Sequence, residues 1–194
     1  DATDVSAGPS YALGQGSTSA IRIYQQNVYV GTDVDAVIAA GASSSDPAVL
    51  FGALIGALQV FDATNWHERA GRMAGAIARY RPDVISLNEI STVSRRGLTG
   101  YGIADNTTDF LPIFLRALSA HGLPYQVVGS VKNTDVLIPL SIDPATGSVI
   151  LGPDGLPAAF AALTDYDVLL ARHGVHIGNV SQKNYQAFLP VNLG

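Results

Sequence analysis

Residues 81–90 read RPDVISLNEI, and residues 21–30 read IRIYQQNVYV. Each stretch is an apolar run with one polar residue near its end, Glu89 in the first and Asn27 in the second. Runs rich in Val and Ile that are bounded by Pro or Gly predict buried strands. A buried strand that ends in a single carboxylate or amide can hold a catalytic group rigidly at the edge of a sheet. The two stretches therefore predict both core strands and the functional side chains that these strands present.

The segment between these strands predicts helices. Asp46 and Pro47 suit the N-cap and first position of a helix over 47–61. Asn65 and Glu68 resemble a capping box for a helix over 66–80, in which apolar residues recur at helical spacing. A short helical turn over 35–40 and a loop over 41–45 precede them.

Beyond residue 90 the sequence predicts a polar loop over 91–106, a helix from Thr108 to the cap at Gly122, and then strands. The predicted strands cover residues 125–131, 136–140, 148–151, 167–171 and 184–189. This order predicts an α/β or α+β layered sandwich in which helices cover one face of a mixed β-sheet. Residues 1–19 have no periodicity and predict a flexible amino-terminal arm, which places the domain over residues 20–194.

The composition excludes several classes of protein. The formal net charge is −5, so the chain lacks the basic surface of a protein that binds nucleic acid tightly and non-specifically. Hydrophobic residues make up 47% of the chain, but its most apolar window, residues 48–61, is shorter than the roughly 20 residues of a membrane span. We therefore expect no transmembrane segment.

The chain has no cysteine, which excludes disulfides, thiolate metal sites and cysteine nucleophiles. It begins with Asp1, and residues 1–19 are rich in small and polar residues. Such a start is typical of a mature chain whose signal peptide has been removed, or of an expression boundary. On this basis we expect a secreted or periplasmic protein.

With its strands placed, the chain resembles the amino-terminal portion of the endonuclease/exonuclease/phosphatase superfamily of metal-dependent phosphoesterases. Residues 81–89 (RPDVISLNE) match the family motif RPDVIxLQE, except that Asn88 stands where Gln is usual. Residues 24–31 (YQQNVYVG) match the family strand that ends in Asn-Val. Residues 123–135 and the DVLLAR strand over 167–172 follow in the family's order, so the resemblance covers about residues 20–190.

The resemblance implies a hydrolase that cleaves a phosphate ester, of the phosphodiesterase, nuclease or phosphatase type, with Mg²⁺ or Mn²⁺ as its cofactor. It implies that Glu89 is a metal ligand, and that Asn27 helps to place the metal or the scissile phosphate. Arg172 and Asn133, which lie at or just beyond strand ends, are candidates for binding the substrate. A solvated strand end explains Arg172 as well, and this interpretation is favoured.

The family's Gly-Asp-x-Asn and Ser-Asp-His motifs are absent from these 194 residues. The resemblance therefore implies about half of the family's four-layer αββα fold, with one apolar sheet face uncovered. Exposing several hundred Å² of apolar surface costs roughly 10 kcal/mol, which is comparable with the stability of a whole domain. We expect a complementary carboxy-terminal polypeptide, from cleavage or from a separate gene, to supply the rest of the fold.

The remaining polar residues allow other interpretations. None of the four histidines occupies the position of the family's catalytic His, and the spacing of His173 and His176 suits a metal less often than a solvated surface. The missing motifs and Asn88 favour a non-catalytic binding or assembly module as the alternative function. An unrelated α/β binding domain, with both motif matches due to chance, is the third possibility.

Overall fold

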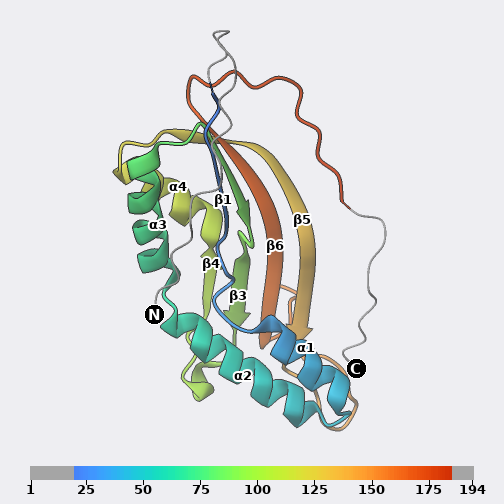
Figure 1. Ribbon diagram of the computed structural model, residues 1–194. Helices are drawn as coiled ribbons and strands as arrows, with labels where there is room; N and C mark the ends of the chain where they lie inside the picture. Colours follow the sequence, from blue (N-terminus) through green and yellow to red (C-terminus); the bar gives the residue numbers. More distant parts are fainter. Residues whose placement is uncertain (1–19, 185–194) are drawn as a thin grey trace.

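Strand β6 (Phe160–Arg172) lies at the centre of a mixed sheet, and the other strands are arranged around it. The computed structural model describes residues 20–184, and in this range the sheet has six strands and is accompanied by four α-helices (Figure 1). The predicted α+β layered fold is therefore confirmed. The predicted arm over 1–19 lies outside the described residues, as does the predicted strand over 184–189 apart from Asn184.

The strand order is β1-β2-β6-β3-β4, and β5 pairs with the opposite side of β6. The C-terminal half of β6 pairs with β2 and its N-terminal half pairs with β3, both antiparallel. The pair β1 and β2 is parallel, and all the other pairs are antiparallel. The bounds of the other strands are β1 (Ile23–Asn27), β2 (Val84–Asn88), β3 (Thr92–Arg96), β4 (Asn106–Asp109) and β5 (Tyr125–Pro139).

A bulge joins β2 to β3. Four residues separate Leu87 from Thr92 on this side, whereas three separate their partners Val168 and Thr164 on β6. The extra residue is absorbed at Glu89, whose backbone is left-handed with φ 60°. The ladder resumes at once, because the N–H of Ile90 donates to the carbonyl of Tyr166 at 2.9 Å. A bulge of this kind re-aims a side chain at the point where pairing is interrupted.

Two helices, α3 (Trp66–Tyr80) and α4 (Phe110–Ala120), lie side by side on one face of the sheet (Figure 1). Helix α3 begins as predicted, since the Asn65 side chain accepts the N–H of Glu68 at 3.3 Å. The Trp66 ring stacks on Phe110 with ring centroids 4.1 Å apart, and the Trp66 indole donates to the Phe110 carbonyl at 3.2 Å. The first turns of the two helices are thus joined in the core.

The other two helices, α1 (Val34–Ser43) and α2 (Pro47–Ala63), lie across the lower end of the sheet in Figure 1. Each begins at an aspartate, Asp33 or Asp46, whose carboxylate caps the first turn. Arg95 on β3 forms an ion pair with Asp62 near the end of α2, and its guanidinium lies 5.4 Å from the centre of the Phe61 ring. Of the described helices, none is by itself long and apolar enough to cross a membrane; α2 and α3 meet that criterion only as a pair, bent by 46° at their junction.

The prediction that residues 91–106 form a polar loop is wrong. It contains β3, the 3-10 turn Thr99–Tyr101 and the first residue of β4. Strand β3 reads TVSRR, and its polarity conceals a buried face formed by Val93 and Arg95. Burial of the Arg95 guanidinium is offset at two of its nitrogens, because Asp62 accepts from Nη2 and the carbonyl of Ala104 accepts from Nε.

Other predicted boundaries change because long strands pair with one another. The predicted strands over 125–131 and 136–140 are one strand, β5, with register shifts at Val127/Gly129 and Lys132/Thr134. Strand β6 begins at Phe160 rather than at residue 167, and residues 148–151 form isolated bridges rather than a strand. Strand β1 is shorter than the predicted 21–30, and α1 is longer than the predicted 35–40.

The upper end of the sheet is closed by Asp83. Its carboxylate accepts the backbone N–H of Arg22 at 2.9 Å and forms an ion pair with Arg172. One carboxylate thus joins the chain before β1, the start of β2 and the end of β6. The hydrogen bond from Arg22, and to a lesser extent the charge of Arg172, hold the pKa of Asp83 below its ordinary value.

Gly97 and Gly102 provide a matched test of packing behind β3. Both have positive φ, 73° and 75°, but a Cβ on Gly97 would lie 2.5 Å from the Ala158 carbonyl, whereas a Cβ on Gly102 would meet nothing within 4 Å. We expect Gly97→Ala to lower the free energy of unfolding by about 3 kcal/mol and Gly102→Ala by about 1 kcal/mol. Urea denaturation measures both, and equal losses would contradict the close approach of Gly97 to the loop before β6.

The lowered pKa of Asp83 makes stability depend on acid. A carboxylate whose pKa is depressed by folding stabilises the protein fully above its unfolded pKa of about 3.9, and this contribution disappears as the pH falls through the lower folded pKa. We therefore expect the stability difference between the wild type and Asp83→Asn to be greatest above about pH 4 and to shrink below it. Thermal melts from pH 7 to pH 2 measure this difference, and a difference that stays constant across the range would show that Asp83 does not contribute in this way.

Candidate functional site

The structure brings Asn27 and Glu89 together at one end of the parallel pair β1–β2. The register pairs Asn27 with Asn88, so Glu89 follows directly beside the end of β1. The amide Nδ2 of Asn27 donates to Glu89 Oε1 at 2.6 Å. The two residues singled out in the sequence are therefore neighbours in the structure, and their chemical roles stay predictions.

The loop after β1 holds the Glu89 carboxylate from the other side. The N–H of Val30 donates to Glu89 Oε2 at 2.8 Å, and the N–H of Tyr29 donates to Asn27 Oδ1 at 2.7 Å. Tyr29 and Glu89 both have left-handed backbones, with φ 61° and 60°. Such conformations cost about 1–3 kcal/mol each in non-glycine residues and concentrate at functional sites. The carboxylate is thus held by Asn27 and by the N–H of Val30, at a point where Glu89 itself and the neighbouring Tyr29 both have strained backbones.

Arg69 on α3 supports this loop. Its Nη1 donates to the carbonyls of Val28 at 2.7 Å and Tyr29 at 3.0 Å, and its Nε donates to the carbonyl of Thr64 at 3.1 Å. Its guanidinium lies 5.0 Å from the Trp66 ring centre, and burial lowers the pKa of Arg69. The helix layer therefore fixes the backbone that in turn holds Glu89.

A second carboxylate, Asp165 on β6, lies beside Glu89 in the same cleft. The hydroxyl of Ser91, which is buried, contacts Asp165 Oδ1 at 2.7 Å and the Glu89 carbonyl at 3.2 Å. Asn133 Nδ2 donates to Asp165 Oδ2 at 3.2 Å. Asn133 is the extra residue at a register shift of β5, which places its side chain against Asp165. The predicted candidate Asn133 thus belongs to the group around Glu89.

A row of amides crosses the exposed face of the sheet next to this group. Gln25 Nε2 donates to Asn88 Oδ1 at 2.9 Å, and Asn88 Nδ2 donates to Asp167 Oδ1 at 2.9 Å. Asn88, the position that departs from the family motif, therefore links β1 to β6. Its shorter side chain reaches partners on both neighbouring strands.

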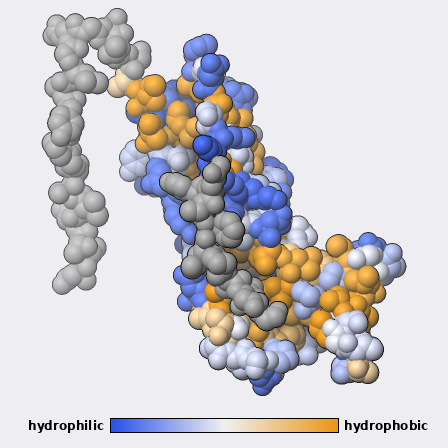
Figure 2. All heavy atoms as spheres, turned by 90° about the vertical axis from the view of Figure 1, so that its right-hand side faces the viewer, coloured by the Kyte–Doolittle hydropathy of each residue, from blue (hydrophilic) through white to orange (hydrophobic). Residues whose placement is uncertain are grey.

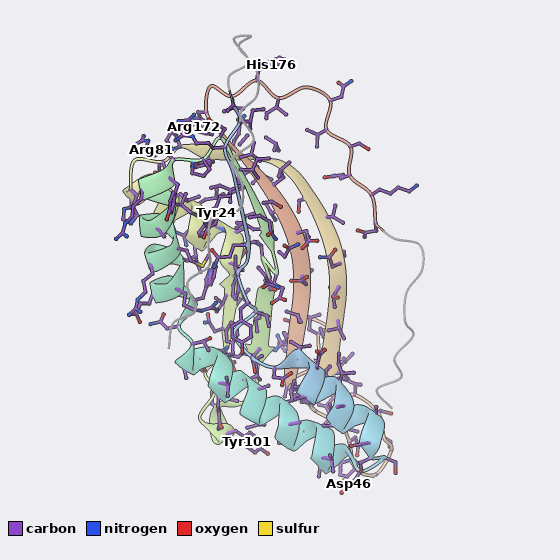
Figure 3. The ribbon with its side chains drawn as sticks, viewed as in Figure 1. Tyr24, Asp46, Arg81, Tyr101, Arg172 and His176 are labelled. Carbon is purple, nitrogen blue, oxygen red and sulfur yellow. The ribbon has the colours of Figure 1, made fainter. Side chains whose placement is uncertain are left out.

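Arg172 lies away from these residues. It is the last residue of β6, whereas Asp165 lies near the middle of that strand, and it pairs with Asp83, as described above. Figure 3 shows Arg172 and His176 at the end of the molecule remote from Asp46 and Tyr101, which lie at the α1 and α2 end. The interpretation favoured from the sequence is a solvated strand end; Arg172 does end β6, but its guanidinium is paired with Asp83, and the structure does not join it to the candidate site.

The sequence pattern does not point to two residues of the site, Ser91 and Asp165. Ser91 lies in the predicted loop over 91–106, and Asp165 precedes the predicted start of its strand at residue 167. A weak signal exists in TDYD over 164–167, where two carboxylates alternate just before an apolar run. Asp165 and Asp167 lie on one face of the strand only if the strand includes residue 165. The strand does so because β3 pairs with residues 160–164 of β6.

The donor set fits a hard divalent cation. Each oxygen of Glu89 accepts one protein hydrogen bond and retains a lone pair, and Mg²⁺ needs only one or two protein carboxylates beside waters and a substrate phosphate. Within residues 20–184, no three acidic or histidine side chains converge into a closed metal cage. Any metal held here would therefore keep an open coordination shell.

The chain was also compared with known proteins. No family model, no curated protein and no solved structure matches it.

Proposed function

We propose that this chain is the metal-binding part of a phosphate-ester hydrolase, with Glu89 as its metal ligand. The observation that carries the proposal is the position of the Glu89 carboxylate, which is held by Asn27 and the N–H of Val30 at a left-handed bulge. It is held at the rim of a cleft that also contains Asp165. The resemblance of residues 81–89 to the phosphoesterase motif supports the same assignment.

The residues of the chain have distinct parts in this proposal. Glu89 binds the cation through its free lone pairs, and Asn27 keeps the carboxylate in position. Asp165, held by Ser91 and Asn133, can accept a hydrogen bond from a water molecule in the cleft. When bound, Mg²⁺ or Mn²⁺ polarises a phosphoryl oxygen and stabilises the charge that develops during attack by water.

The proposal includes a complementary carboxy-terminal polypeptide or segment. None of the described histidines lines the cleft, so a histidine that activates water, as the resemblance implies, would belong to the complementary polypeptide. The sheet face opposite α3 and α4 also offers a docking surface. Ile23 and Leu169 are exposed there, beside the polar row of Gln25, Asn88 and Asp167.

The alternative function is a non-catalytic binding or assembly module that retains the fold. The lack of a histidine at the cleft among the described residues favours this alternative. The two functions differ in one observable. A module of this kind would leave phosphate esters intact even when combined with the complementary polypeptide.

Replacing Glu89 by Gln tests the proposed metal ligand. Gln keeps the length of the side chain and can still accept the N–H of Val30, so the fold is retained while the ligand charge is lost. We expect the affinity for Mn²⁺ to fall by more than about tenfold, measured by isothermal titration calorimetry on the intact chain. Asn27→Ala should lower the affinity by a smaller factor, because Asn27 only positions the carboxylate.

Glu68→Gln is the matched control. Glu68 lies exposed on α3 and pairs with Arg72 in an i,i+4 arrangement, so its loss removes the same charge away from the site. Its Mn²⁺ affinity should equal that of the wild type. Equal affinities of Glu89→Gln and Glu68→Gln, with thermal melts showing both folded, would remove Glu89 from the proposed site.

The proposed complementary polypeptide can be tested by mass. We expect the protein purified from its natural source to yield, under denaturing conditions, either a second polypeptide or a longer chain that contains the missing Asp, Asn and His. A single species at 20.2 kDa would contradict this part of the proposal and would favour the binding module. The measurement is intact mass spectrometry, followed by peptide sequencing of any additional species.

A further inference from the structure

A cleft of about 880 Å³ is lined by residues of the helices α1 and α2 and of the strands β3, β5 and β6. This volume is in the range of small-molecule binding sites. Its inner walls are aliphatic, and Glu89, Ser91 and Asp165 lie on its lining. The residues that define these walls are Val37 and Ile38 of α1, Leu54 and Leu58 of α2, and Val136 and Ile138 of β5.

The polar lining of the cleft carries only negative charge. Its ionisable residues, besides Tyr29, are Asp33, Asp35, Glu89 and Asp165, and no Lys, Arg or His is among the described lining residues. The hydroxyl groups of the cleft belong to Tyr29, Thr32, Ser91 and Thr134, and the aliphatic walls themselves offer no hydrogen-bonding side chains. A nucleobase or sugar packed against these walls would leave polar groups without partners. The wall chemistry therefore suits a saturated hydrocarbon chain.

The apolar surface continues outside the cleft onto the loop that joins β5 to β6. Ile138 lines the cleft and also a neighbouring hollow that contains Ile142. Beyond Ile142 the loop exposes further large apolar side chains, which are Val149, Ile150, Leu151 and Leu156. Figure 2 shows apolar surface at this lower end of the molecule, as at its upper end, with a largely hydrophilic middle between them. Clustered exposed apolar side chains of this kind mark interaction sites.

We infer that this cleft binds the aliphatic chain of a phosphate ester, with the ester phosphate next to Glu89 at the rim. The position of the phosphate rests on the proposed function, whereas the binding of the hydrocarbon chain rests on the cleft alone. The exposed apolar loop provides a continuous apolar path along which such a chain can enter. The carboxylates at the rim disfavour a bare phosphate, which is why the phosphate is placed where the cation is proposed to bind.

Binding is tested first without metal, on the intact chain, with 1-butanol and 1-octanol as probes. The transfer of each methylene from water to an apolar site increases affinity by roughly fourfold. We expect 1-octanol, which has four more methylenes, to bind about 250-fold more tightly than 1-butanol, with NMR shifts at the methyl groups of Leu58 and Val136. Binding that does not depend on chain length, or no binding by either alcohol, would overturn the inference.

Ala57→Phe fills the cleft, because Ala57 lines it, and Gln59→Phe is the matched control on the exposed side of α2. We expect Ala57→Phe to reduce 1-octanol affinity by more than about tenfold and Gln59→Phe to leave it unchanged. Val136→Phe, on the half-exposed strand β5, is a second cleft-filling variant should Ala57→Phe fail to fold cooperatively. Unchanged affinity in a folded cleft-filling variant would overturn the inference.

Hydrolysis separates the inference from the proposed function. The rates for methyl phosphate and octyl phosphate are compared with Mn²⁺ present, using the chain combined with its complementary polypeptide. Faster turnover of octyl phosphate, lost in Ala57→Phe, supports both. Chain-length-dependent binding of alcohols without turnover of either ester upholds the aliphatic site and overturns the hydrolase. Turnover that is equal for both esters upholds the hydrolase and overturns the aliphatic site.

Discussion

Strand β6 pairs with two short strands, β2 and β3, which are joined by only three residues. The β2–β6 ladder and the β3–β6 ladder differ in register by one residue. Glu89 absorbs this difference at the bulge. Because the bulge turns the backbone, the Glu89 side chain leaves the ladder and reaches Asn27 and the N–H of Val30. The same short link places the buried Ser91 next to Asp165. The arrangement of the whole candidate site therefore depends on how β6 registers with its two neighbours.

The strain at this bulge is balanced from the helix layer. Tyr29 and Glu89, both left-handed, each cost about 1–3 kcal/mol, so the surrounding contacts have to over-determine their conformation. Arg69 does so for the loop after β1, because its planar guanidinium binds carbonyls of Val28, Tyr29 and Thr64 at once. Trp66, one turn earlier on α3, packs against both Arg69 and Phe110. The packing of the two helices is thereby transmitted to the position of one carboxylate.

The sequence predicts those parts of the fold that local chemistry determines. Caps at Asp46 and Asn65 define two helix starts, and the ends of β1 and β2 place Asn27 beside Glu89. Strand β3 could not be predicted, because the burial of Arg95 is compensated by Asp62, which is far away in sequence. The place of Asp165 in a strand could not be predicted for a similar reason, because only long-range pairing with β3 extends β6 to that position. The sequence predicts that β6 ends near Arg172. The ion pair between Arg172 and Asp83 could be identified only from the way β2 and β6 pair.

The charges of the cleft link the proposed metal to the proposed substrate. Four carboxylates line the cleft, and no Lys, Arg or His is among its described lining residues. The resulting negative potential repels a phosphate and attracts a divalent cation. The aliphatic walls lower the local dielectric, which strengthens both effects. A phosphate ester entering this cleft without metal would gain hydrophobic contacts from its chain and lose electrostatic energy from its headgroup. The cation and the ester are therefore expected to bind cooperatively, each improving the affinity of the other by the same factor. This coupling makes the acidic rim and the apolar walls parts of one proposed site rather than two separate features.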